Sequence, residues 1–252
     1  MSDFNRNVTA RGGFADRTAA VDAGLRAYML RVYNYMAAAV ALTGVVAWLC
    51  FQNAVVTNEA GAITGLTSFG QMLLGGYTPI VLMLATLGLV FFISFRIHTL
   101  QYTTALALFM FYAALLGAAL TSVLVAYTGA SVARVFFISA ASFGALSLYG
   151  YTTQRDLSAM GSFLIMGLFG IIIASLVNIF LKSSGLDWAI SVIGVGVFAG
   201  LTAYDTQRIK EMYDSMDDDG TMGRKAIMGA LSLYLDFINL FLMLLRLVGD
   251  RR

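Results

Sequence analysis

Seven long runs of apolar residues, separated by polar connections, constrain the fold of this chain more than any other feature of its sequence. The hydrocarbon core of a bilayer is about 30 Å thick, and a helix that rises about 1.5 Å per residue needs about 20 apolar residues to cross it. The sequence therefore predicts an all-α, polytopic membrane protein with seven transmembrane helices. The predicted crossings are residues 32–51, 79–95, 102–127, 132–149, 160–181, 188–205 and 226–248.

Composition excludes several other classes of protein. The chain is 59% hydrophobic and only 12% charged, whereas soluble domains carry about 25% charged residues. Its net charge of +2 is not gathered into a basic stripe, so nucleic acid is not expected as a partner. With one cysteine, Cys50, and one histidine, His98, the chain has no disulfide pair and no zinc-ligand cluster, and no cofactor is expected.

Residues 1–30 differ in character from the rest of the chain. They carry arginines and aspartates without an apolar core, so they do not resemble a cleavable signal peptide. We expect residues 1–30 to form a polar, flexible cytosolic tail, and residues 31–252 to form the seven-helix membrane domain.

The distribution of lysine and arginine predicts the orientation in the membrane. With the N-terminus in the cytosol, eleven basic residues lie inside and five outside, which satisfies the positive-inside rule. Three of the outer ones, Arg246, Arg251 and Arg252, follow the last run and are on the unfavourable side after seven crossings. Either the last helix tolerates them or one run is re-entrant and the C-terminus is cytosolic; we favour seven crossings.

Asp236 is the carboxylate that falls in the middle of a predicted crossing. Burying a charge there costs about 2.5 to 3.5 kcal/mol on insertion scales, so such a residue is by default a candidate for function. Small and polar residues share its helix face: Gly229, Ser232, Asn239 and Met243. This face should point into the bundle. A neutral acid that serves only packing is the alternative.

Asp205 ends the sixth run and is the natural partner of Asp236. Alone it could be a solvated helix-end residue, but the sixth and seventh runs are consecutive and antiparallel, so the two side chains can meet. Two adjacent carboxyl groups cannot both ionise easily and take up protons as one unit, which makes them sensitive to pH. When ionised they could bind Ca²⁺ transiently. Arg96 could pair with Asp205 in a closed state, or it could simply extend towards the membrane surface.

The segments around these acids resemble the Bax-inhibitor family of membrane proteins, also called the transmembrane Bax inhibitor motif or lifeguard family. The similar segments are YDTQRI at 204–209 and LYLDFINLF at 233–241, and the likeness extends over residues 30–248. It implies a bundle whose last helix is wrapped by the other six, with Asp205 and Asp236 as a pH-responsive gate for passive Ca²⁺ leak. It also implies a bacterial-type member in the cell inner membrane, whose partners are the lipid bilayer, Ca²⁺ and protons.

Two other functions stay open. The chain could be a non-transporting modulator that binds other membrane proteins, such as a membrane protease in quality control. It could also be an intramembrane aspartyl protease, because two acids lie on consecutive helices. The second alternative is weakened by Leu233, Tyr234 and Leu235, which precede Asp236 where a Gly-x-Gly element would let a substrate strand approach. We therefore expect that the chain is not an enzyme.

Overall fold

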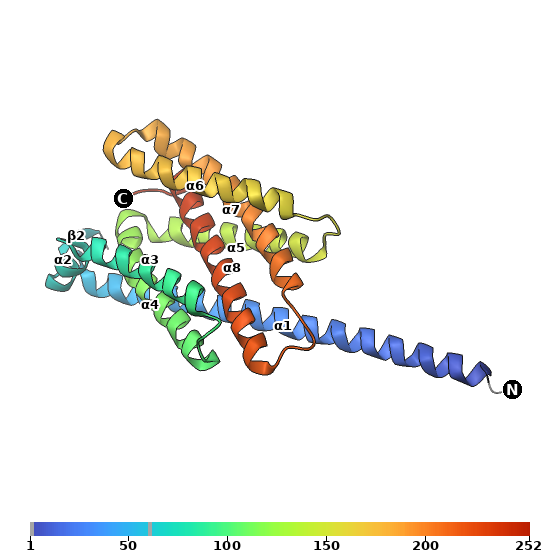
Figure 1. Cartoon of the computed structure of the whole chain (residues 1–252). Coiled ribbons are helices and arrows are strands. Elements are labelled where there is room, and N and C mark those ends of the chain that lie inside the picture. Colours follow the sequence, from blue (N-terminus) through green and yellow to red (C-terminus); the bar gives the residue numbers. More distant parts are fainter. Residues whose placement is uncertain (1–2, 60–61) are drawn as a thin grey trace.

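The computed structural model describes the backbone of residues 3–59 and 62–252, and the side chains of residues 21–59 and 62–252. Within these ranges, seven helices are long and apolar enough to cross a membrane, which confirms the predicted all-α, polytopic architecture (Figure 1). The long helices are α1 (Asp3–Ala54), α3 (Thr78–Arg96), α4 (Tyr102–Ala126), α5 (Gly129–Thr152), α6 (Ser158–Leu181), α7 (Ser184–Glu211) and α8 (Asp219–Val248).

The last helix, α8, lies at the centre of the bundle. It packs against α1, α4, α5 and α7, while α3 lies outside on α4 and α6 lies outside on α7. Most of α8 is buried because four helices pack around it, and Leu233 and Tyr234 are completely inaccessible. The central position of the last helix is therefore confirmed, although four neighbours, not six, form most of its wall.

Polar caps make several helices longer than the apolar runs predict. The side chain of Thr128 caps α5, that of Ser183 caps α7 and that of Asp218 caps α8 by accepting hydrogen bonds from backbone N–H groups of the first turn. Each cap lies outside the hydrocarbon-length run, so hydrophobicity alone does not locate it. Consequently the connection between α7 and α8 is limited to residues 212–218.

Helix α1 runs through the boundary expected between the tail and the membrane domain. It is continuous from Asp3 to Ala54. Tyr28 and Met29 are buried in the core. The packed part of the chain therefore begins before residue 31, while the flexibility of residues 1–30 stays a prediction.

The connection between α1 and α3 contains regular structure that the sequence pattern did not indicate. Strands β1 (Val55–Thr57) and β2 (Ile63–Leu66) pair antiparallel, and the short helix α2 (Ser68–Leu74) follows. Gly70 lies against the carbonyl oxygen of Ala54, where a Cβ atom would approach to 2.0 Å. A glycine is needed there because α2 packs directly onto the end of α1.

The C-terminal residues are fixed to the connection between α4 and α5. The N–H group of Thr128 donates to the carbonyl of Asp250 at 3.0 Å, and that of Arg252 donates to the carbonyl of Ala126 at 3.0 Å. The guanidinium group of Arg252 lies over the ring of Phe51, near the C-terminal end of α1. The N- and C-terminal ends of the chain thus lie at opposite ends of the bundle (Figure 1), as seven complete crossings require.

Candidate functional site

The structure brings the two predicted acids together between α7 and α8. Asp236 lies near the middle of α8 and is only 5% exposed. Asp205 lies in the last third of α7 and is half-buried. Their carboxyl groups are within side-chain hydrogen-bond reach of each other. Oδ2 of Asp236 is buried and has no hydrogen-bond partner in the described part of the chain, which is unusual for a buried polar atom.

Two glycines allow α7 and α8 to approach closely on both sides of this pair. A Cβ atom on Gly229 of α8 would meet the side chain of Ile209 at 2.9 Å, and one on Gly194 of α7 would meet Sδ of Met243 at 2.8 Å. Gly229, Asp236 and Met243 are seven residues apart and therefore share one face of α8. This face points to α7 and holds the carboxyl pair in the helix interface.

The basic residue beside Asp205 is Arg208, one turn further along α7. Arg96, which the sequence offered as a possible partner, is exposed at the end of α3, and no ion pair joins it to Asp205 among the residues whose side chains are described. Helix α3 packs on α4, on the outside of the bundle. The spacing of three residues between Asp205 and Arg208 on one helix could have indicated Arg208 as the basic neighbour of Asp205.

The polar residues expected to support the pair do not hydrogen-bond to it. Asn239 donates through its side-chain amide to the carbonyl of Leu235 at 2.8 Å, within its own helix. Ser232 is half-buried. Within the described side chains, neither residue makes a hydrogen bond to Asp205 or Asp236, so their supporting role stays a prediction.

Gln207 of the YDTQRI segment and Lys210, directly after it, anchor α7 to its neighbours, a role that sequence reasoning missed. The side-chain amide of Gln207 donates to the carbonyl of Arg155 at 2.8 Å, and its oxygen accepts from the N–H group of Leu157 at 2.9 Å. Nζ of Lys210 donates to the carbonyl of Tyr151 at 2.9 Å. These bonds fix the end of α7 to α5 and to the connection between α5 and α6.

A chain of hydroxyl groups connects α1, α5 and α7 next to the pair. The hydroxyl of Thr206 donates to the carbonyl of Thr202 at 2.7 Å, and Ser147 Oγ lies 2.9 Å from Thr206 Oγ1. The Tyr33 hydroxyl lies 2.6 Å from Ser147 Oγ. Since Thr206 gives its proton to the backbone, the order of donation is Tyr33 to Ser147 to Thr206. The sequence signal for this chain is weak, because single serines and threonines are common in membrane helices.

The arrangement can hold a proton more readily than a metal ion. Two carboxylates offer up to four oxygens, whereas Ca²⁺ takes six to eight. Among the side chains of residues 21–59 and 62–252, no group of three or more histidine, cysteine, aspartate or glutamate residues lies close enough together to hold a metal ion. A cation at this site would need water or carbonyl oxygens to complete its coordination.

Asp156 and Asp218, in the segments that connect the helices, differ from the buried pair because they are exposed and bound by local hydrogen bonds. Hydrogen bonds from the hydroxyl and N–H groups of Ser158 lower the pKa of Asp156, which lies between α5 and α6. Hydrogen bonds from Thr221 and Gly220 likewise lower the pKa of Asp218. Both side chains are exposed, and their role is to stabilise turns and helix ends.

Comparisons with known proteins agree with the fold. A family model described as "Inhibitor of apoptosis-promoting Bax1" matches residues 25–252. An uncharacterized protein of Rickettsia prowazekii is 48% identical over 257 residues, covering 100% of both chains. The inner membrane protein YbhL of Escherichia coli K12 is 48% identical over 232 residues, covering 91% of this chain and 94% of YbhL. A protein of Caulobacter vibrioides is 45% identical over 259 residues, covering 100% of both chains. With its seven apolar helices, the chain is a multi-pass inner membrane protein that belongs to the Bax-inhibitor family.

Proposed function

We propose that the chain is a pH-sensitive leak pathway for Ca²⁺, gated by Asp205 and Asp236. The observation that carries this proposal is the position of Asp236, a buried carboxyl group in the middle of the central helix, opposite a second carboxyl group on α7. Charged groups at membrane depth are costly to bury and typically mark proton or ion pathways.

A shared proton provides the gating step. While one proton lies between the two carboxyl groups, they can hydrogen-bond and α7 and α8 stay in contact. Loss of that proton leaves two negative charges, which repel each other by about 4 kcal/mol at 4 Å in a medium of effective dielectric constant 20. A hydrogen bond contributes only about 1 kcal/mol. Repulsion therefore outweighs the hydrogen bond and favours an open helix interface.

Ionisation also creates the binding site for the cation. The separated carboxylates attract Ca²⁺ and supply hard oxygen ligands, with water and backbone carbonyls completing the shell. Reprotonation removes the charge and releases the ion. In this scheme only protons are exchanged and the Ca²⁺ ion passes chemically unchanged, so the chain acts as a transporter of Ca²⁺ and protons, not as an enzyme, and needs no cofactor.

We also propose that the N-terminus is cytosolic. Eleven lysines and arginines lie at that end of the bundle and five at the other. Three of the five are close to acids: Arg134 lies 2.7 Å from Asp250, and Arg246 and Arg251 each lie 3.9 Å from Asp187. These contacts reduce the net positive charge on the outer side, and so lower the cost of the C-terminal arginines there.

The test is Ca²⁺ entry into liposomes that contain the purified protein and a Ca²⁺ indicator, at pH 6 and at pH 8. Wild type should admit Ca²⁺ faster at pH 8 because the pair is then ionised. Asp236→Asn and Asp205→Asn should stay slow at both pH values, since an amide cannot ionise. Asp214→Asn, the same substitution at an exposed acid between α7 and α8, should behave as wild type.

Two results would contradict the proposal. Entry no faster than into protein-free liposomes at either pH would exclude the leak, and would favour a modulator that binds other membrane proteins. Entry that changes with pH equally in wild type and in both asparagine variants would place the gate elsewhere in the chain.

A further inference from the structure

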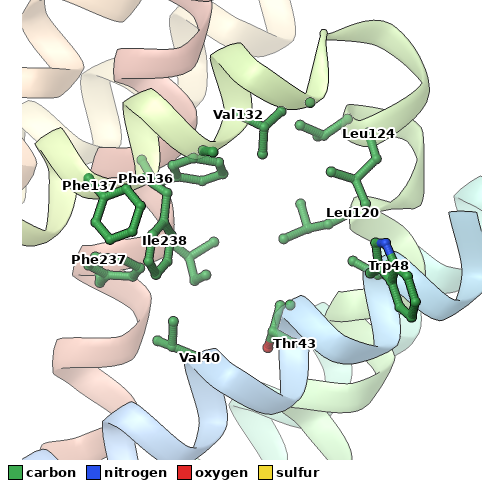
Figure 2. A pocket seen from close by; sticks show the side chains of 16 residues that line it. Val40, Thr43, Trp48, Leu120, Leu124, Val132, Phe136, Phe137, Phe237 and Ile238 are labelled. Atoms are coloured by element: carbon green, nitrogen blue, oxygen red, sulfur yellow. The ribbon is translucent and has the colours of Figure 1, made fainter. Parts of the chain in front are cut away.

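We propose that a membrane phospholipid binds between α1 and α5, with one acyl chain in an apolar hollow and its phosphate group at Arg252. The hollow has a volume of about 400 Å³ and lies at the end of the bundle that holds the C-terminus. Its walls come from α1, α4, α5 and α8, and Figure 2 shows their side chains around an open space. This site is separate from the aspartate pair and does not depend on the proposed leak.

The lining of the hollow excludes water. Nearly all side chains that line it are apolar, and Thr43 provides the single hydroxyl group. That hydroxyl is already occupied, because it lies 2.9 Å from the carbonyl of Ala113 and 2.6 Å from the hydroxyl of Tyr234. A cavity needs two or more free polar partners to hold a water molecule, and apolar cavities stay dry. A hydrocarbon is therefore the suitable occupant.

The hollow opens sideways, towards the lipid. Helices α1 and α5 both contribute walls but do not pack extensively against each other. Trp48 of α1 and Phe137 of α5 stand on opposite sides of the space (Figure 2) and are 55% and 70% exposed. Both belong to helices that cross the membrane, so the surface that they expose contacts acyl chains. A chain can enter between them.

Positive charge lies at the membrane-surface end of the hollow. Phe51 follows Trp48 by one turn of α1, and the guanidinium group of Arg252 lies 5.4 Å from the centre of the Phe51 ring. Its Nε donates to the carbonyl of Tyr127, the residue directly after α4 and three residues beyond Leu124 of the hollow, at 3.1 Å. Among the described side chains, no carboxylate pairs with Arg252 within 4 Å.

This charge selects a phospholipid over a neutral hydrocarbon. The remaining guanidinium N–H groups of Arg252 suit the oxygens of a phosphate, which arginine binds in a planar, two-point geometry. The guanidinium contacts Phe51 and Tyr127, each about one helical turn beyond a residue that lines the hollow, so one lipid can place its phosphate at Arg252 and its acyl chain in the hollow. A volume of about 400 Å³ is in the range of ligand pockets, roughly 300 to 1,000 Å³.

Trp48 provides a direct probe of the site, because the chain has only one other tryptophan, Trp188. In a Trp188→Phe background, detergent-solubilised protein is titrated with phosphatidylglycerol whose acyl chains carry bromine, a quencher of tryptophan fluorescence. Excess detergent keeps the bulk lipid dilute. Binding in the hollow predicts saturable quenching of Trp48 that reaches its plateau at about one lipid per protein.

Two glycines supply a matched pair of variants. A Cβ atom on Gly44, which lines the hollow, or on Gly88, which lies on α3 away from it, would meet no atom within 4 Å. Gly44→Leu should fill the hollow and shift half-maximal quenching to at least tenfold more lipid, whereas Gly88→Leu should not change it. Ala133→Phe fills the same hollow from α5 and keeps the test valid if Gly44→Leu does not fold.

Arg252→Gln tests the phosphate contact, with Arg96→Gln as the control at an exposed arginine of α3. The first should weaken lipid binding several-fold and the second should not. Quenching that rises linearly with lipid and is the same in Gly44→Leu would overturn the site. Equal binding by wild type and Arg252→Gln would overturn the phospholipid as its ligand. So would a brominated alkane without phosphate that quenches Trp48 at the same concentration as brominated phosphatidylglycerol.

Discussion

The hydroxyl group of Tyr234 on α8 lies 2.6 Å from Oγ1 of Thr43 on α1, completely enclosed by protein. Thr43 Oγ1 also lies 2.9 Å from the carbonyls of Ala39 and Ala113, so its own proton goes to one of them and Tyr234 must be the donor to Thr43. Through this contact three helices, α1, α4 and α8, share one polar point in an otherwise apolar core, two residues before Asp236.

Removal of this hydroxyl should destabilise the bundle. Tyr234→Phe leaves Thr43 without its donor, and we expect a loss of about 1 kcal/mol in unfolding free energy, measured by denaturant titration in detergent micelles. Tyr112→Phe is the control, since the Tyr112 ring packs edge-on against Tyr234 but its hydroxyl makes no hydrogen bond among the described residues. Equal losses in the two variants would show that the Thr43 contact does not contribute.

Gln207 should control the order of the connection between α5 and α6. Gln207→Leu removes both of its hydrogen bonds and leaves the buried N–H group of Leu157 unpaired, which costs about 1 to 3 kcal/mol. Amide hydrogen exchange of residues 153–157 should become faster. Gln101→Leu, at an exposed glutamine before α4, should leave that exchange unchanged; no acceleration in Gln207→Leu would contradict the anchoring role.

The cap of α8 should contribute a pH-dependent stability. Because Thr221 and Gly220 hold the pKa of Asp218 below its ordinary value of about 4, the ionised form stabilises the folded state. This contribution is complete above pH 4 to 5 and is lost as the pH falls through the lowered pKa.

The measurement compares the melting temperatures of wild type and Asp218→Asn at pH 7 and pH 3. At pH 7 wild type should melt at a higher temperature than Asp218→Asn, and at pH 3 the difference between the two should be smaller. Thr221→Val removes the main donor to Asp218 and should reduce the same difference. A gap between wild type and Asp218→Asn that does not change with pH would contradict this explanation.

Labelling of single cysteines should establish the orientation. In a Cys50→Ala background, Thr57→Cys places a thiol on the exposed hairpin after α1, and Ser215→Cys places one between α7 and α8. A maleimide that cannot cross the inner membrane should label the first and not the second in cells with a permeabilised outer membrane. The reverse pattern would show that the N-terminus faces outward.

The positions of the helices could be predicted from the sequence because a bilayer imposes a fixed hydrophobic length. The predicted run 102–127 agrees with α4 (Tyr102–Ala126) within one residue. The run 188–205 is too short for α7 (Ser184–Glu211), because residues 206–211 are mostly polar yet stay helical through their contacts with α5. Tertiary contacts, not hydrophobicity, determine that end.

The pair at Asp205 and Asp236 could be proposed because charge is rare at membrane depth and consecutive helices are neighbours. The partner of Asp205 could not be predicted in the same way. Periodicity gives the face of a helix but not which helices pack on the outside, so Arg96 on α3 was considered as a partner of Asp205 and Arg208 was not. The fixed C-terminal residues were also missed, because their backbone hydrogen bonds to Ala126 and Thr128 leave no pattern in side chains.

The protonation state of the carboxyl pair tests the central claim most directly. Infrared difference spectra of the protein in lipid, recorded between pH 6 and pH 8, separate a protonated carboxyl group from a carboxylate by its C=O stretching band. Wild type and Asp214→Asn should lose one protonated-carboxyl band on going to pH 8, and Asp236→Asn should lack this change. If the band is lost equally in Asp236→Asn, or if wild type shows no change between the two pH values, the pair does not carry the proton that gates the pathway.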